Sequence, residues 1–579
     1  MQCYTTPQLR IKRGGGGAKN LDSSSSPVAT FVFFAFLCCY AFIVFYDSAF
    51  AVIDDHTLIQ TLLIGQNIPL THHIIPEIGR FYPLDGQDLN VLSAIFGASA
   101  SVFYGFNALC VLVVGLCLSY AIATLLPFIA PHTKAPKTIA YILVALLLLT
   151  PAFCGSWFRL FVPERMEFVF LSIMLASYAF VANNRGMLSV IVLIIGGLSA
   201  MIACFYKETA FILIGSFAFT HLLLTFLNKR SVNHRALPNR KLMVFDVLLL
   251  CACVVWVVAY YVFVIAQKTT SGRYGDTLHN PLIVFAKNLF TYIMNEPFLF
   301  VLVPLLCFYR VFVIVRAYKA SPTSSPFIPI LDSSLCACAA FMGAYLVLNI
   351  SSAHYPLPGY IFGLVALSAI PALWTHLSGF VRKVFAVVIA LCVGIFVSNS
   401  LFYSAHTIAH YKASGQNLQS TLAFFSSQNK PVSIMLEGVD CTLIEKSEVC
   451  YSFEKWLEYA GVKATIVPDR DMYNPLRKSL ESTFEKVDSS QSDSTKAAPQ
   501  PQYLILTPYS SNFVNSEYIA HLDSTYKRIY HADFGLNLGF VGIKTLMKYA
   551  LAKDSSNLVF SGNIWNLPAH FYVYELPQK

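Results

Sequence analysis

The sequence is poor in charge. Asp, Glu, Lys and Arg make up 12% of its 579 residues, whereas soluble globular proteins carry about 25%. Hydrophobic residues account for 56%, and they gather in long blocks separated by short polar segments. Because a helix needs about 20 apolar residues to cross a bilayer, this pattern excludes an ordinary soluble protein. It predicts a polytopic α-helical membrane protein.

Other features are also missing. The apolar blocks lack the period-two alternation that is typical of a transmembrane β-barrel. The adjacent His72 and His73 would point apart on a helix or strand, and no Cys/His spacing near them suits zinc. Most of the 15 cysteines fall inside apolar blocks and act there as small apolar residues. Asn349 begins the only N-x-S/T sequon and sits at a predicted membrane edge. The long polar segment 403–579 therefore has no sequon, which favours a bacterial protein.

The apolar blocks predict eleven spans. They cover 28–50, 103–130, 138–153, 166–182, 187–205, 209–227, 243–266, 298–315, 332–350, 358–375 and 384–402.

The loops between these spans fall into two sets by charge. One set, which includes the N-terminal tail and the segment 228–241, is rich in Lys and Arg and nearly free of acids. The other set holds almost all the acids that precede residue 403. By the positive-inside rule the basic set is cytoplasmic, so the N-terminus is inside and the C-terminus outside. The net charge of +9 therefore suits an anionic membrane surface rather than nucleic acid.

This topology divides the chain into three parts. Residues 1–27 form a basic, disordered cytoplasmic tail, and residues 28–402 form the membrane domain with a long outer loop at 54–102. Residues 403–579 are polar, with short strand-like runs at 432–436, 464–467, 503–507 and 571–576 and helical patterns between them. We expect a small extracytoplasmic α/β domain. Cys441 and Cys450 lie in it, where a disulfide is chemically permitted.

Ionisable groups of both signs gather on the outer ends of the predicted helices. They occur in the segments "AVIDDHTLIQ" (51–60), "IPEIGRFYPLDGQD" (75–88), "WFRLFVPERMEF" (157–168), "CFYKETAFI" (204–212), "QKTTSGRYGDTLHNP" (267–281) and "SSAHYPLPGY" (351–360). The first two segments belong to the same outer loop, so five loops contribute. Because charge near hydrocarbon is costly, charges of both signs from five loops on one rim suggest a site. Such a site suits a substrate that is both anionic and rich in hydroxyls.

The chain resembles the GT-C superfamily of integral membrane glycosyltransferases. The resemblance lies in the acidic pair that opens the first outer loop, in "PERMEF", "YKETAF" and "HYPLPGY", and in the outer C-terminal domain. It implies a GT-C-like fold and an inverting transfer of sugar from a polyprenyl-phosphate carrier to a glycan, lipid or protein hydroxyl. The chain looks most like bacterial enzymes that modify surface polysaccharide or protein, which implies the inner (plasma) membrane and a periplasmic C-terminal domain.

The resemblance also implies roles for residues. Asp54 or Asp55 matches the family's catalytic acid; the family pair is often Asp-Glu, so the choice between the two stays open. A base must take the acceptor proton, and cations must stabilise the leaving phosphate. The expected phosphate and donor ligands are Arg165, Lys207, Arg273 and Arg80. The expected acceptor or orienting residues are Glu164, Glu208, His56, His354 and Tyr355.

Metal use and function class each leave an alternative. The acidic pair could hold a divalent cation such as Mg²⁺ or Mn²⁺, although a monophosphate donor favours no metal. An O-antigen polymerase or ligase is the rival enzyme. A lipid-linked glycan flippase or transporter would place charge at span centres and show internal repeats, whereas the span centres here are nearly free of charge. A structural or assembly protein would not need the polar rim.

Overall fold

The computed structural model describes residues 27–53, 55–131, 133–184, 186–230, 240–268, 281–320, 326–348, 352–374, 377–437, 439, 441, 448–467, 500–508, 516–536, 538 and 569–577.

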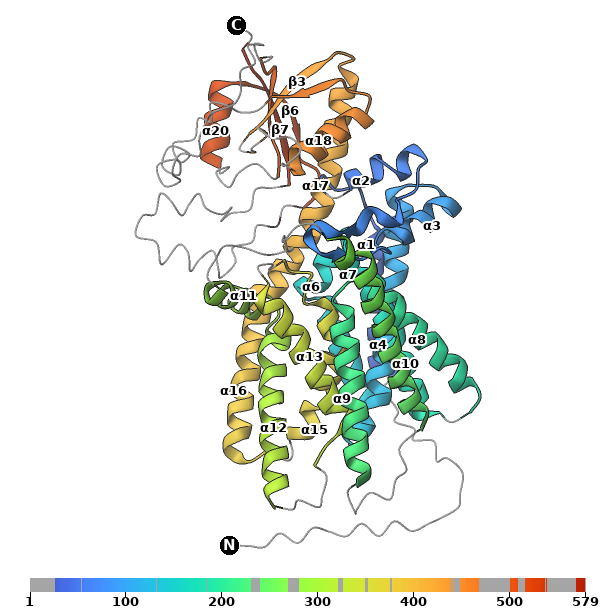
Figure 1. Ribbon diagram of the computed structural model, residues 1–579. Helices are drawn as coiled ribbons and strands as arrows, with labels where there is room; N and C mark the ends of the chain where they lie inside the picture. The colour runs from blue at the N-terminus through green and yellow to red at the C-terminus, as the bar shows by residue number, and fades with distance from the viewer. Residues whose placement is uncertain are drawn as a thin grey trace.

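Long helices form a bundle, with a sheet domain at one end (Figure 1). In the described residues, ten helical runs are long and apolar enough to cross a membrane, or eleven if a bent pair is counted as one span. This confirms the predicted polytopic helical architecture. The helices of the bundle are α1 (Pro27–Phe45), α4 (Ala100–Ile129), α5 (Pro136–Leu148), α6 (Pro151–Trp157), α7 (Pro163–Asn183), α8 (Leu188–Tyr206), α9 (Ala210–Arg230), α10 (Arg240–Phe263), α11 (Pro281–Asn295), α12 (Val303–Ala320), α13 (Pro329–Val347), α14 (Tyr360–Ser368), α15 (Ile370–Trp374) and α16 (Gly379–Ile395).

The bent pair is α5 and α6, which meet at 63°. Pro151 opens α6 and has no N–H to continue α5. The hydroxyl of Thr150 caps the new helix by accepting from the N–H of Phe153 at 3.2 Å. Glu296 accepts from the N–H of Ala152 at 2.7 Å and from the hydroxyl of Tyr360 at 2.6 Å. The predicted span 138–153 is therefore two helices, the second held by its cap.

The outer surface of the bundle is apolar. Large hydrophobic side chains of α1, α8, α10, α12 and α16 are more than one-third exposed, for example Phe31 at 74% and Phe308 at 75%. A soluble protein rarely exposes so much contiguous apolar surface. The bilayer is the solvent that these faces suit.

Buried polar groups also occur within the spans. Tyr178 of α7, His221 of α9 and Asp246 of α10 contact one another, with His221 Nδ1 2.7 Å from Asp246 Oδ2 and Tyr178 donating to Asp246 Oδ1 at 3.2 Å. All three residues are at most 4% exposed. Asp246 is the fourth residue of the predicted span 243–266, so this closed cluster of three adjacent helices lies near a span end and does not contradict the expectation that the span centres are nearly free of charge.

A continuous helical run connects the bundle with the sheet domain. It consists of α16, the π-helical segment Phe396–Ser400 and α17 (Leu401–Ser427). The predicted boundary at 402 falls inside this run, which leaves the bundle and enters the domain without a break (Figure 1).

The C-terminal domain is a mixed five-stranded sheet with strand order β4-β3-β5-β7-β6. β3 pairs in parallel with β4 and β5, and β7 pairs antiparallel with β5 and β6. The alternating or apolar runs predicted as strands form β3, β4, β5 and β7. Cys441 is disulfide-bonded to Cys450, the latter in α18. The domain's elements are β3 (Val432–Leu436), α18 (Glu448–Tyr459), β4 (Ala464–Ile466), β5 (Tyr503–Leu506), α20 (Ser516–Thr525), β6 (Lys527–Ala532) and β7 (Phe571–Glu575).

The first outer loop lies between the bundle and the domain (Figure 1). It holds α2 (His56–Ile59), a short antiparallel pair of β1 (Ile74–Ile75) and β2 (Arg80–Phe81), and α3 (Gln87–Phe96). The segment that directly precedes this loop packs against the domain. Phe50 stacks on Trp456 of α18, and the indole N–H of Trp456 donates to the carbonyl of Val52 at 3.3 Å.

Candidate active site

Asp55 is held at the junction between the first loop and the domain. It directly precedes α2, is 1% exposed, and accepts from the backbone N–H of Ala51 at 2.7 Å. Because the preceding segment is fixed by Trp456, the domain and α1 together set the position of this carboxylate. Asp54 lies outside the described residues.

Three buried ion pairs lie at the same end of the bundle and join segments far apart in the sequence. Arg165 NH2 is 2.5 Å from Asp88 Oδ2, and the guanidinium also donates to Asn107. Lys207 Nζ is 2.8 Å from Glu164 Oε1, and Arg80 Nε is 2.5 Å from Glu208 Oε1. All three cations are less than 10% exposed. We call these pairs the rim ion pairs.

Tyrosine rings join two of the rim ion pairs. The guanidinium of Arg80 lies 4.5 Å from the ring centre of Tyr82, and Lys207 Nζ lies 5.5 Å from the same ring. Lys207 is also 5.2 Å from the ring of Tyr355, which stacks on Tyr345. The Lys207 ammonium therefore has a carboxylate on one side and aromatic faces on others. Such surroundings retain a cation in a poorly solvated place.

Asp85 and His73 form an uncharged contact within the first loop. Burial, together with the nearby charge of Asp88, raises the pKa of Asp85 to about 8. Burial, together with the charges of Arg80 and Lys207, lowers the pKa of His73 to about 3. Because His73 Nε2 lies 3.4 Å from Asp85 Oδ2, Asp85 holds the proton of this pair at neutral pH. The loop thus carries a protonated carboxyl beside three cations.

Tyr104 connects Asp55 with the rim ion pairs. It interacts electrostatically with both Asp55 and Arg165, and its hydroxyl donates to the carbonyl of Phe158 at 3.3 Å. The acidic residue of the first loop and the cationic rim thus belong to one neighbourhood.

Other predicted residues occupy varied places. The imidazole of His56 contacts the hydroxyl of Ser452 at 2.7 Å and meets the Tyr451 ring edge-on, so it faces α18. His354 lies against Tyr355 and interacts electrostatically with Glu164. Arg273 lies outside the described residues.

The sequence-based site omitted several residues. Asp88 and Asp85 were visible as acids in "YPLDGQD", but nothing in the sequence identified Arg165 or His73 as their partners. Glu167 is 0% exposed, and both its carboxyl oxygens lack a hydrogen-bond partner among the described residues. It lies one helical turn after Glu164 and interacts electrostatically with Lys207. Its position in "PERMEF" was the available signal.

Within the described ranges, no three His, Cys, Asp or Glu side chains are placed to hold a metal ion. Asp54, half of the predicted cation site, is not among these residues.

No family model matches the chain, and no curated protein does. Among solved structures, the Archaeoglobus fulgidus oligosaccharyltransferase tethered with an acceptor peptide is similar over 94% of this chain and 88% of its own, with 10% identity and a TM-score of 0.41. ArnT from Cupriavidus metallidurans bound to undecaprenyl phosphate is similar over 88% and 97%, with 12% identity and a TM-score of 0.41. The A. fulgidus enzyme with Zn and sulfate covers 82% and 68%, with 12% identity and a TM-score of 0.38. These likenesses assign no residue role and no reaction to this chain.

Proposed function

We propose that the chain is an inverting glycosyltransferase that moves a sugar from a polyprenyl-phosphate carrier to a hydroxyl of a glycan, lipid or protein acceptor. The convergence of Arg80, Lys207 and Arg165 with Asp55 at one end of an apolar bundle supports this. A donor with a long lipid tail must present its phosphate where spans end, and this is where the cations lie.

The reaction is a single displacement. The acceptor oxygen attacks the anomeric carbon, the bond from that carbon to the phosphate oxygen breaks, and the configuration inverts. Asp54 or Asp55 takes the acceptor proton, which needs only an ionised carboxylate of ordinary basicity. The electron pair of the broken bond leaves with the polyprenyl phosphate, where cations stabilise the added charge.

The rim ion pairs are suited to bind phosphate. Each cation already has a carboxylate partner, and phosphate offers the same charge sign and the same kind of acceptor oxygen. Lys207 supplies a compact point charge, and Arg80 a planar fork. The phosphate of the lipid-linked sugar would accept hydrogen bonds from the N–H groups that now face Glu164 and Glu208. Those two acids would then be free to orient acceptor hydroxyls. The carboxyl of Glu167, which has no hydrogen-bond partner among the described residues, is a further hydrogen-bonding group for sugar hydroxyls.

The proposed setting is a bacterial inner membrane with a cytoplasmic N-terminus and an outer sheet domain. It rests on the charge of the loops. The proposed reaction does not require a metal, and a divalent cation at Asp54 and Asp55 remains the alternative for a diphosphate donor. Membrane lipids and the lipid-linked sugar are the expected partners, and nucleic acid is not.

The decisive experiment measures sugar transfer by the full chain in lipid nanodiscs supplied with polyprenyl-phosphate sugars and candidate acceptors. We expect Asp54→Asn or Asp55→Asn to lower turnover by about 10²–10⁴, the usual contribution of a general base. Lys207→Gln should weaken donor use, whereas Lys455→Gln, on the surface of α18, should leave the rate unchanged.

The readout is release of polyprenyl phosphate together with labelled product. Full turnover in both Asp variants, at wild-type protein levels, would exclude these acids as the base. Lipid-linked sugar crossing the bilayer without bond cleavage would instead identify a flippase. That alternative draws on the Tyr178–His221–Asp246 cluster, because ionisable groups inside spans often mark transport paths.

A further inference from the structure

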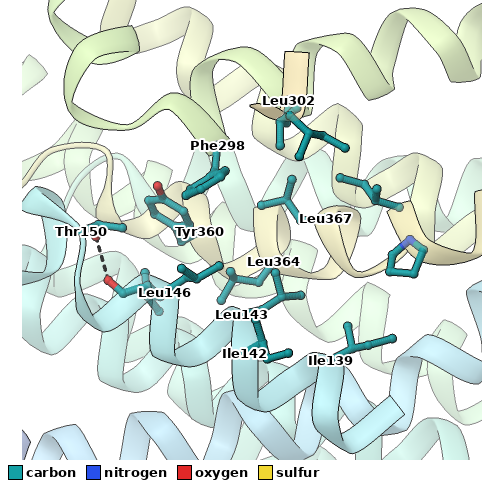
Figure 2. A pocket seen from close by; sticks show the side chains of 14 residues that line it. Ile139, Ile142, Leu143, Leu146, Thr150, Phe298, Leu302, Tyr360, Leu364 and Leu367 are labelled. Atoms are coloured by element: carbon teal, nitrogen blue, oxygen red, sulfur yellow. Dashed lines mark hydrogen bonds between the residues drawn. The ribbon is translucent and has the colours of Figure 1, made fainter. Parts of the chain in front are cut away.

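An apolar groove runs along α5 on the side that faces α14 and α16. It has a volume of about 250 Å³ and is lined by residues of α5, α14, α15 and α16 and of the π-helical segment Phe298–Leu302. Figure 2 shows Thr150 and Tyr360 at one end and Ile139 at the other. The sequence indicates no role for it, and the proposed reaction does not use it.

The described residues that line the groove offer no polar group to a ligand. The hydroxyl of Thr150 donates to the carbonyl of Leu147 at 2.8 Å, and the hydroxyl of Tyr360 donates to Glu296 at 2.6 Å. With both hydroxyls engaged, only hydrocarbon suits this surface.

A second hollow continues the groove at the end of the bundle away from the sheet domain. It has a volume of about 540 Å³ and shares Ile139 and Pro371 with the groove. Here the chemistry changes. Lys134 lines this hollow, together with Thr133, whose buried hydroxyl has no hydrogen-bond partner among the described residues.

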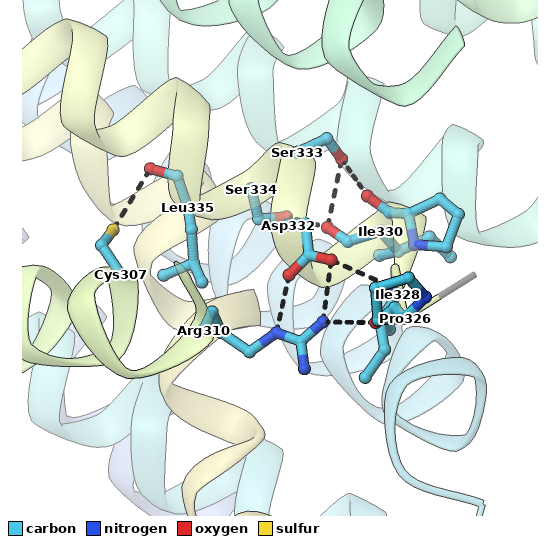
Figure 3. Close-up of polar contacts among 10 residues, drawn as sticks. Cys307, Arg310, Pro326, Ile328, Ile330, Asp332, Ser333, Ser334 and Leu335 are labelled. Carbon is cyan, nitrogen blue, oxygen red and sulfur yellow. Dashed lines mark hydrogen bonds and ion pairs between the residues drawn. The ribbon is translucent and has the colours of Figure 1, made fainter. Parts of the chain in front are cut away.

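A nearby arginine has its charge neutralised within the protein. Arg310 forms a two-bond pair with Asp332, Nε to Oδ1 at 2.7 Å and NH2 to Oδ2 at 2.9 Å, and also donates to the carbonyl of Pro326 (Figure 3). Asp332 in turn accepts from the N–H of Ile328 at 2.8 Å. These bonds hold Ile328, which lines the second hollow, in place. Among the described lining residues, Lys134 is the one that carries charge.

The dimensions match a lipid of one leaflet. From Ile139 to Leu147 the groove follows nine residues of α5, which span eight rises of about 1.5 Å, or about 12 Å. Half of a bilayer's hydrocarbon core is about 15 Å thick. This apolar channel has a cation at its mouth, and a hydroxyl there that lacks a hydrogen-bond partner among the described residues. Its layout suits an acyl chain below an anionic headgroup.

We propose that the two hollows form a binding site for an anionic phospholipid of the leaflet opposite the sheet domain. Its phosphate would contact Lys134 and the hydroxyl of Thr133, and one acyl chain would lie along α5 over Leu143 and Leu364. The lipid would fill the space between α5 and α14, whose other ends hold Thr150 and Tyr360 beside Glu296. The site is separate from the rim ion pairs and does not depend on the proposed reaction.

Native mass spectrometry of the full detergent-purified chain tests this, with added phosphatidylglycerol or phosphatidylcholine of identical acyl chains. We expect phosphatidylglycerol to be retained preferentially. Lys134→Gln should lower its retention about fivefold, the effect of one basic residue on an anionic lipid. Lys319→Gln, which removes the same charge from the last turn of α12, should not change it.

Substitution of a lining residue by a larger side chain tests whether the groove holds the lipid. Ile142→Trp fills it from a half-exposed lining position and should reduce phosphatidylglycerol binding, whereas Ile191→Trp, on the outer face of α8, should not. Equal retention of the two lipids, or unchanged binding in Lys134→Gln, would overturn the proposal. So would displacement of phosphatidylglycerol by polyprenyl phosphate in the wild-type chain, since the groove would then belong to the donor.

Discussion

At the scale of single residues, the notable feature is how charge is buried. Arg165, Lys207 and Arg80 each lie within 2.8 Å of a carboxylate oxygen that comes from a different segment. Removing one partner of such a pair typically costs about 3–5 kcal/mol, because the other charge is left buried and alone. The pairs therefore fix the first loop on α7 and on the α8–α9 junction.

The Asp85–His73 contact predicts a pH dependence of stability. Asp85 has a raised pKa of about 8 in the folded chain and about 3.9 when unfolded, so this residue's contribution falls as pH rises between those values. His73 has a lowered pKa of about 3 against about 6.5 unfolded, so its contribution rises with pH up to 6.5 and is constant above. Of these two groups, only Asp85 titrates between about pH 6.5 and 8, and its contribution to stability should fall there by up to about 2 kcal/mol.

Thermal unfolding in nanodiscs across that pH window checks this. Asp85→Asn keeps a polar contact to His73 but cannot ionise, so its melting temperature should decline less steeply with pH than that of the wild type. Glu458→Gln, at an exposed acid of α18, should keep the wild-type slope. An Asp85→Asn chain with the wild-type slope would show that another group titrates.

At the scale of elements, long apolar blocks predicted the spans well, because a bilayer demands length and hydrophobicity that can be counted along the chain. The strands of the sheet domain were predictable for a similar reason. The break between α5 and α6 was missed because it depends on the cap at Thr150 and on Glu296, which is distant in sequence. Partners such as Arg165 and Asp88, 77 residues apart, could not be predicted without the fold.

The Tyr178–His221–Asp246 cluster should stabilise the packing of α7, α9 and α10 against one another. Asp246→Ala would leave His221 and Tyr178 buried with a partner lost, at a cost of about 1–3 kcal/mol for each unsatisfied group. Asp246→Asn can still accept and donate, so it should lose clearly less. Thermal unfolding of the two variants in detergent measures the difference. If Asp246→Ala unfolded like the wild type but abolished function, the cluster would serve function instead of helix packing.

At the scale of the whole molecule, the continuous helical run from α16 to α17 joins the bundle directly to the sheet domain. The segment after α1 lies against α17: Gln416 donates to Asp47 at 2.9 Å, and Lys412 donates to the carbonyl of Tyr46. Leu418 and Leu422 share an apolar cluster with Val52. The segment after α1, together with α17 and α18, therefore sets the position of Asp55. The sheet domain thus contributes to the proposed site, even though its strands carry none of the proposed catalytic groups.

Gly415 tests this coupling. A Cβ at this position of α17 would lie 3.0 Å from the carbonyl oxygen of Phe50 and 3.1 Å from that of Ala49, closer than ordinary contacts, and Phe50 is held on its other side by Trp456. Gly415→Val should therefore push the segment off α17 at a cost of about 1–3 kcal/mol, as overpacking does. Asp55 accepts a hydrogen bond from Ala51 in the same segment, and a misplacement of about 1 Å can lower a rate by about 10²-fold.

Gly394→Val is the matched control, because no atom of the described residues lies within 4 Å of its added Cβ in α16. Thermal unfolding and sugar transfer measured together should show both losses in Gly415→Val and neither in the control. Normal transfer by a destabilised Gly415→Val chain would mean that the domain supports the fold without positioning the acid.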